Sequence, residues 1–145
     1  LLTRIRNFCK KINKKFFLAN NIKLAKNLKL DGVYIPSFYK SLNTHNLNTN
    51  KKFLKIGSAH SIKEIRIKEK QGVKLIFISP LFYNKKNKEF LDSTRFNNLT
   101  LKTSLKTIAL GGINAKNIIR LKQIKSYGFA SISYLESEYK FKGNK

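Results

Sequence analysis

The sequence contains no methionine, a single cysteine and only 7 acidic residues among its 145 residues. Because a reading frame normally opens with methionine, a start at Leu1 inside an already helical pattern predicts that the chain is a piece of a longer protein. The lone Cys9 excludes a disulfide within the chain and is typical of a reducing compartment, so we expect a cytoplasmic protein. No apolar run approaches the roughly 20 residues of a membrane span, and we expect no membrane partner.

The shortage of acids leaves a strongly basic chain, with 31 Lys and Arg and a formal net charge of +24. Such an excess ordinarily indicates a nucleic-acid or anionic-membrane partner. Here the lysines occur in every segment, and only 5 of the basic residues are arginine, which DNA-binding proteins favour. The 26 lysines and 16 asparagines are both encoded by A-rich codons. We therefore attribute most of the charge to genome composition, with an anionic small-molecule site as the alternative, and expect no dedicated nucleic-acid partner.

Apolar residues alternate between helical and strand patterns along nearly the whole sequence. Helical spacing predicts helices over 1–14, 22–28, 62–71, 91–102 and 114–126. Short apolar runs predict strands over 16–19, 33–35, 53–57, 73–78, 107–110 and 129–133. The strands are apolar on both faces and none shows hairpin spacing, which is typical of a parallel α/β sheet. We expect one α/β domain over residues 1–145.

The pattern alone leaves open whether this sheet is open or closed into a barrel. Small and polar residues follow the strands, among them Ser37, Ser58, Ser79 and Ser133. In a barrel these ends line a single mouth, where binding residues gather. This arrangement favours a barrel. Because a complete (β/α)8 barrel usually needs about 250 residues, six strands in 145 residues predict an N-terminally truncated TIM barrel without its first two strands.

A pair of glycines, Gly111 and Gly112, stands between an expected strand and an expected helix. Two glycines let the backbone approach a ligand closely, and a helix N-terminus presents free N–H groups to an anion. The motif therefore indicates either a phosphate cradle or an ordinary tight turn. Ser133, at the expected end of the next strand, would be a neighbour in a barrel and a further donor to the same phosphate. This pairing favours the phosphate site.

The segment Gly57-Ser58-Ala59-His60-Ser61 ends another expected strand. Ser58 and His60 are candidates to hydrogen-bond a polar heterocycle, and a helix-capping turn is the alternative, with Ser61 as the cap. No carboxylate partner that would make His60 a catalytic base is evident in the sequence.

The strongest expected strand is followed by Phe82 and by a basic loop with Lys85, Lys86 and Lys88. Three ammonium groups at a barrel mouth could hold a diphosphate, or they could form an ordinary solvated run. Phe82 could stack on a flat ring or pack in the core. Two isolated histidines and one cysteine do not make a zinc site. Magnesium would need carboxylates near the mouth, whereas Asp31 lies at the opposite end of its strand.

Four segments, taken in order over about residues 16–135, resemble the thiamine-phosphate synthase/TenI family. They are Asp31-Gly32-Val33-Tyr34-Ile35-Pro36, Gly57-Ser58-Ala59-His60-Ser61 with Glu64, Ile78-Ser79-Pro80-Leu81-Phe82, and Ala109-Leu110-Gly111-Gly112-Ile113. The resemblance implies a (β/α)8 barrel of which this chain holds strands three to eight. It also implies a transferase that joins hydroxymethylpyrimidine diphosphate to thiazole phosphate, with Mg2+ assisting the departure of diphosphate, so that the partners would be phosphorylated heterocycles.

Carried over to this chain, the resemblance assigns the thiazole phosphate to Gly111, Gly112 and Ser133. It places Ser58 near the diphosphate or pyrimidine, and it makes Phe82 part of the ring pocket.

The departures from the family pattern concern the diphosphate and magnesium half. The family has Asn-Asp where this chain has Ala19-Asn20, so no metal ligand is secure. Pro36-Ser37-Phe38-Tyr39 replaces Gly-Gln and the acids that follow, and Asn84-Lys85-Lys86-Asn87 replaces Thr-Pro-Thr-Lys. The resemblance therefore implies either a weakened synthase or a non-catalytic or divergent TenI-like binder of a heterocyclic phosphate.

Overall fold

The structure is a computed structural model that describes residues 1–43, 52–83 and 89–142, with side chains as far as residue 137. Its helices are α1 (Leu2–Lys11), α2 (Ile22–Asn27), α3 (Ile62–Lys70), α4 (Asp92–Thr100) and α5 (Ser133–Lys142), with the 3-10 helix η1 (Ile118–Gln123). Its strands are β1 (Phe17–Ala19), β2 (Gly32–Ile35), β3 (Leu54–Ala59), β4 (Leu75–Ile78), β5 (Lys106–Leu110) and β6 (Gly128–Ala130). None of the helices described is long and apolar enough to cross a membrane.

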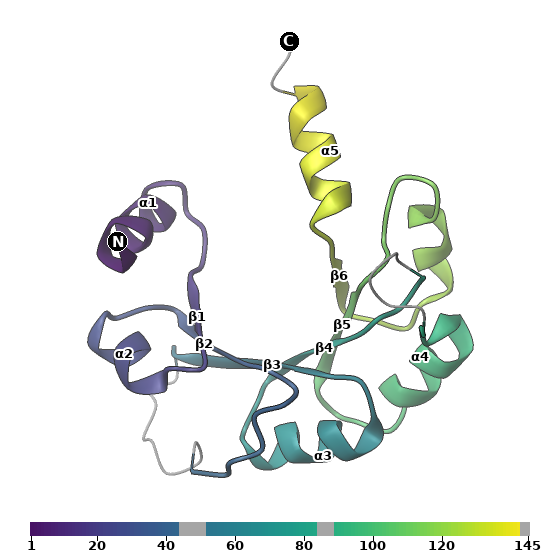
Figure 1. Cartoon of the computed structure of the whole chain (residues 1–145), viewed down its shortest axis with the longest axis horizontal. Helices are drawn as coiled ribbons and strands as arrows, with labels where there is room; N and C mark the ends of the chain where they lie inside the picture. The colour runs from purple at the N-terminus through teal and green to yellow at the C-terminus, as the bar shows by residue number, and fades with distance from the viewer. Residues whose placement is uncertain (44–51, 84–88, 143–145) are drawn as a thin grey trace.

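The six strands form one sheet in the order β1-β2-β3-β4-β5-β6, and every neighbouring pair is parallel. Right-handed crossovers between strands in this order place the helices on the same face of the sheet. Figure 1 shows α2, α3 and α4 on the outside of the curved sheet. A doubly wound open sheet would instead reverse its strand order at a switch point. The strand order therefore confirms the expected α/β fold of barrel type.

The outward faces of the strands supply the core of the protein. Val33, Ile35, Ile76 and Ile78 are at most 2% exposed and form one cluster with the helix side chains Ile65 on α3 and Phe96 on α4. The inward faces line a concave hollow of about 790 Å³ that is rich in apolar side chains, including Leu54, Ile56, Phe77 and Ile108. The outward faces are buried, whereas the inward faces are partly covered and line the hollow, so that apolar side chains occur on both faces of the strands.

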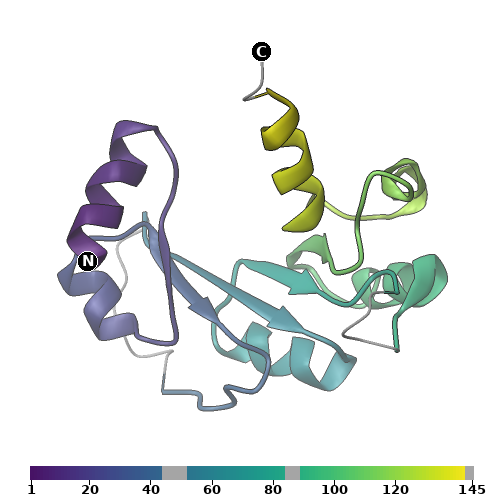
Figure 2. The same cartoon turned by 45° about the horizontal axis from the view of Figure 1, so that its top comes forward.

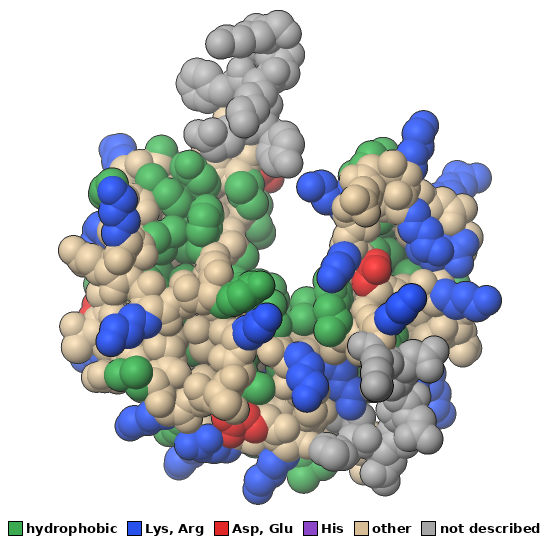
Figure 3. All heavy atoms as spheres, turned by 180° about the vertical axis from the view of Figure 1, so that it is seen from behind, with side chains coloured by type: hydrophobic (Ala, Val, Ile, Leu, Met, Phe, Trp, Pro, Cys, Tyr) green, Lys and Arg blue, Asp and Glu red, His purple; other side chains and the backbone are tan. Residues whose placement is uncertain are grey.

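The basic side chains are dispersed over the surface. Figure 3 shows Lys and Arg spread across the whole of one face, with hydrophobic side chains between them. This distribution agrees with the sequence, in which no segment is set apart as a basic tail.

The C-terminal part differs from the expectation in two places. Residues 114–126 were expected as one α-helix, but only the short 3-10 helix η1 forms there. Asn114 and Asn117 side chains bond to the backbone of the preceding turn, with both Nδ2 groups donating to the carbonyl of Gly112 at 3.2 and 2.7 Å. Such local bonds compete with helix formation.

Ser133 was expected at the end of the last strand, but it is the exposed first residue of α5. Strand β5 ends at Leu110, which pairs with Ala130, so β6 has no partner strand beyond that residue. Ser131 then accepts a hydrogen bond from the N–H of Tyr134 at 3.2 Å and begins the helix. Figure 2 shows α1 and α5 standing at the two ends of the sheet.

Candidate functional site

The carboxyl ends of β2, β3 and β4 bring several of the predicted residues together. Ser58 lies inside β3 and is 5% exposed, and its Oγ accepts a hydrogen bond from the Tyr34 hydroxyl at 2.8 Å. The Tyr34 ring meets Phe77 edge to face, with the ring centroids 6.1 Å apart. Because Tyr34 donates to Ser58, the Ser58 hydroxyl keeps its own hydrogen for another acceptor. Nothing in the sequence pattern indicates Tyr34 as a partner of this serine.

His60 follows β3 directly and is fixed from two sides. Its Nδ1 lies 2.7 Å from the carbonyl oxygen of Ser79 and 3.3 Å from the hydroxyl of the same residue. A carbonyl can only accept, so Nδ1 carries the proton in a neutral imidazole and Nε2 is left as an acceptor. The backbone N–H of His60 donates to Glu64 Oε2 at 2.6 Å, and Ser61 Oγ accepts from the N–H of Glu64 at 3.4 Å. The Ser61 cap is the one that the sequence predicts, whereas the Glu64 carboxylate accepts from the residue before the cap and not from the cap residue itself.

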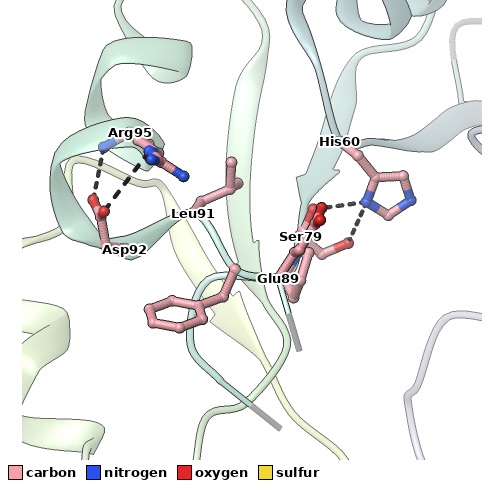
Figure 4. A pocket seen from close by; sticks show the side chains of 8 residues that line it. His60, Ser79, Glu89, Leu91, Asp92 and Arg95 are labelled. Atoms are coloured by element: carbon pink, nitrogen blue, oxygen red, sulfur yellow. Dashed lines mark hydrogen bonds and ion pairs between the residues drawn. The ribbon is translucent and has the colours of Figure 1, made fainter. Parts of the chain in front are cut away.

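His60 also borders a hollow of about 700 Å³ between the end of β3 and the beginning of α4. Figure 4 shows His60 bonded to Ser79 on one side of the view, and the Asp92–Arg95 pair on the opposite side. The Asp92 carboxylate accepts from the backbone N–H of Arg95 at 3.0 Å and lies 4.0 Å from its guanidinium. Both residues are well exposed, so this ion pair contributes little to stability. It gives the hollow charges of both signs, which the sequence analysis did not anticipate.

Gly111 and Gly112 are required by close packing. They adopt φ of +95° and +72°, a region that favours glycine. A Cβ on Gly111 would lie 2.9 Å from Pro80, and one on Gly112 would lie 2.2 Å from the carbonyl oxygen of Phe82. The segment after β4 crosses at this point and donates from Phe82 N–H to the carbonyl of Gly111 at 3.1 Å. The glycine pair is therefore a tight turn that holds two loops of the mouth together.

The same turn leaves backbone donors available. Among the residues that the structure describes, the N–H groups of Gly111 and Gly112 have no acceptor. Free backbone N–H groups are donors to which an anion can bind. The expected contribution from a helix N-terminus is absent here, because η1 begins only at Ile118. The hydroxyl tied to this turn belongs to Ser131, which donates to the carbonyl of Ile113 at 2.8 Å, and not to Ser133.

Phe82 is 3% exposed and belongs to the core cluster, so its ring packs rather than facing the mouth. The Arg120 guanidinium lies 4.7 Å from the ring centroid, which is within the range of a cation–π contact. This contact places a cation beside the segment that touches Gly112. The predicted lysines Lys85, Lys86 and Lys88 lie outside the described residues.

Asn20 follows β1 with φ of +57°, a conformation that asparagine tolerates. Together with Asn21, Tyr39 and Asn43 it lines a second, smaller hollow of about 210 Å³ beside β1 and β2. Asn21 Oδ1 already accepts from the N–H of Leu24 at 3.0 Å and caps α2. Within the described part of the chain, no carboxylate or imidazole lines this hollow, and no cluster of three His, Cys, Asp or Glu occurs. These residues do not fit the magnesium site implied by the resemblance, since amides are poorer ligands than carboxylates.

Comparison with known proteins identifies the family. A sequence model described as thiamine monophosphate synthase matches residues 1–135. The chain belongs to the thiamine monophosphate synthase family. The resemblance drawn from the four sequence segments is therefore confirmed.

Two curated relatives of this chain are thiamine-phosphate synthases of Prochlorococcus marinus. One, from strain SARG, is 30% identical over 123 residues, which are 83% of this chain and 35% of that protein. The other, from subsp. pastoris, is 30% identical over 132 residues, which are 89% of this chain and 36% of that protein. The chain thus spans about a third of the length of these relatives.

Solved structures agree on the fold. A thiamine phosphate pyrophosphorylase from Pyrococcus furiosus superposes with a TM-score of 0.72 at 18% identity, covering 90% of this chain and 63% of that one. A structure titled "Native KDPGal structure" superposes with a TM-score of 0.65 at 9% identity, covering 90% of this chain and 62% of that one. At these identities the likeness concerns the barrel architecture alone.

Proposed function

We propose that this chain carries out the step of thiamine biosynthesis in which a pyrimidine diphosphate and a thiazole phosphate are joined. The observation that carries this proposal is the family match over residues 1–135. It is supported by the Gly111-Gly112 turn at the carboxyl ends of the strands, which has free N–H donors for a phosphate. In this reaction the thiazole nitrogen attacks the methylene carbon of the pyrimidine. The carbon–oxygen bond to the diphosphate breaks, and the diphosphate leaves with the electron pair.

The residues of this chain divide between the two substrates in this proposal. The N–H groups of Gly111 and Gly112 hold the thiazole phosphate, and Ser131 keeps their turn in place through Ile113. The buried hydroxyl of Ser58 donates toward the bond that breaks, while Tyr34 orients it. The pyrimidine diphosphate occupies the side of β1 and β2, where Asn20 lines the smaller hollow. Lys85, Lys86 and Lys88 remain predicted contacts of the diphosphate.

A second candidate is a non-catalytic or divergent TenI-like binder of a heterocyclic phosphate. It is favoured by Asn20 and by the absence of a carboxylate among the residues that line its hollow. In this case the chain binds the thiazole phosphate but does not bind the second substrate productively.

The test is to incubate the chain with both substrates and Mg2+ and to measure thiamine phosphate by its fluorescent oxidation product. Asn20→Asp is assayed beside the natural sequence, and Asn43→Asp serves as a matched control that adds a carboxylate elsewhere in the same hollow. A strong rise in turnover in Asn20→Asp, with no rise in Asn43→Asp, supports a weakened synthase. Saturable binding of thiazole phosphate without turnover in any variant supports the binder. If the chain shows neither binding nor turnover, both functions are rejected.

A further inference from the structure

Two polar side chains at the end of α3, Lys68 and Gln71, are completely buried, each with 0% of its surface exposed. A lysine on a helix normally keeps its ammonium group in water, because burying an unpaired charge is costly. The donor groups of both side chains therefore need hydrogen-bond acceptors inside the protein, and the positions of these acceptors indicate the role of the two residues.

The acceptors lie in loop 36–41, which follows β2. Lys68 Nζ donates to the carbonyl oxygens of Pro36 at 2.7 Å and Tyr39 at 2.8 Å, and to Gln71 Oε1 at 3.1 Å. Gln71 Nε2 donates to the carbonyl oxygens of Tyr39 at 2.9 Å and Ser41 at 2.8 Å. Lysine and glutamine thus bind each other and hold three carbonyls of one loop.

Loop 36–41 belongs to no helix or strand, so its conformation depends on such contacts. Within the loop, the N–H of Tyr39 donates to the carbonyl of Pro36 at 3.1 Å. Ordering a backbone of this kind is opposed by conformational entropy at every residue, and the bonds from α3 offset that cost. The loop is therefore fixed from the helix side of the sheet.

Tyr39 connects this arrangement to the mouth. Its carbonyl receives a hydrogen bond from both Lys68 and Gln71, and Tyr39 also lines the hollow that contains Asn20, Asn21 and Asn43. Its neighbour Phe38 is 72% exposed. The residue held most firmly by α3 is thus the one that forms a wall of the hollow.

We propose that Lys68 and Gln71 are positioning residues that fix Tyr39 and loop 36–41 as one wall of this hollow, and so set its affinity for a pyrimidine diphosphate. This inference rests on the proposed function, which assigns that substrate to this side of the mouth. Neither residue touches the substrate, since both are buried under the loop.

The first test measures binding by titration calorimetry, with hydroxymethylpyrimidine diphosphate and thiazole phosphate as separate probes. Lys68→Met and Gln71→Met keep side-chain volume but remove the donors, while Ile65→Val perturbs the same buried face of α3 without touching the loop. We expect Lys68→Met and Gln71→Met to weaken pyrimidine diphosphate binding by about tenfold and thiazole phosphate binding by less than about twofold. Ile65→Val should leave both within about twofold. An unchanged pyrimidine diphosphate affinity, or an equal loss for both probes, would overturn the inference.

A second measurement does not depend on the proposed function. Hydrogen exchange of the loop amides reports directly whether α3 holds the loop. In Lys68→Met, the amides of residues 37–41 should exchange about tenfold faster, while those of β3 and β4 stay unchanged. Unchanged exchange in the loop would overturn the inference even if the substrates bind. If the natural chain binds neither probe but the loop amides respond as expected, the positioning of the loop stands and the proposed function fails.

Discussion

Replacing Lys68 by methionine should change stability in a way that depends on pH. Burial lowers the pKa of Lys68 from 10.5 to about 8, and the charge of Glu64 opposes this effect. In the unfolded chain the lysine returns to its ordinary pKa, so between pH 8 and 10.5 the unfolded state binds more protons than the folded state. The stability of the natural chain therefore rises with pH through this window, and the methionine variant lacks this increment.

The size of the effect follows from the two pKa values. Their difference corresponds to about 3 kcal/mol, which is the cost that the buried ammonium imposes at pH 7. Methionine removes this cost but leaves carbonyls of the loop without a donor, which costs about 1–3 kcal/mol. Near pH 7 the two terms largely offset each other, and the variant should fold. At pH 10.5 the natural chain should have gained about 3 kcal/mol over the variant.

Urea unfolding followed by circular dichroism at pH 7, 9 and 10.5 measures this difference. The matched control is Lys63→Met, which removes one positive charge from an exposed position of the same helix. Burial also lowers the pKa of Lys55, with Lys26 and Lys74 adding to the effect, but Lys55 is present in all three proteins and cancels in the comparison. A difference in the free energy of unfolding between the natural chain and Lys68→Met that stays constant with pH would show that burial does not lower the pKa of Lys68.

Three further predictions concern packing and charge. Gly112→Ala should lower stability by at least about 2 kcal/mol, because the φ of Gly112 is positive and a Cβ would meet the Phe82 carbonyl. The control Gly128→Ala should cost less than about 1 kcal/mol. An equal fall in Tm for the two variants in thermal melts would contradict this prediction. Phe96→Ala, at a fully buried position on α4, should cost about 3–5 kcal/mol in urea unfolding, and a loss below about 1 kcal/mol would place this ring outside the core. Binding to duplex DNA, followed by fluorescence anisotropy, should fall steeply with salt and vanish near about 0.15 M; tight binding at that salt would support a nucleic-acid partner.

The alternation of helices and strands could be predicted because the outward strand faces and the inner faces of the helices are mostly apolar, with Lys55, Thr107 and Lys68 among the buried exceptions. The same pattern could not predict where β6 ends. That boundary depends on β5, which stops at Leu110 and deprives the chain beyond Ala130 of a partner strand. Ser133 was therefore expected at a strand end but begins α5, and it is Ser131 that bonds to the turn; the phosphate contact of Ser133 stays a prediction.

Ser58, His60 and the glycine pair of the candidate site can be identified in the sequence, but the tertiary contacts that hold them cannot. Gly111 and Gly112 are visible in the sequence because few residues other than glycine tolerate the turn, although the closeness of Pro80 to Gly111 and of Phe82 to Gly112 is a tertiary contact. Lys68 and Gln71 could not be identified in this way. Among the 26 lysines of the chain, Lys68 resembles any solvated lysine on a helix, and its burial depends on loop carbonyls that lie 32 and 29 residues away in the sequence.

The most direct test of the proposed function is a titration of the isotopically labelled chain with thiazole phosphate, followed by amide chemical shifts. We expect saturable shifts that centre on Gly111 and Gly112 and extend to Ser131, and no such shifts with the unphosphorylated thiazole alcohol. Shifts that do not saturate and are spread over the lysines, or an equal response to the alcohol, would contradict a phosphate site at this turn.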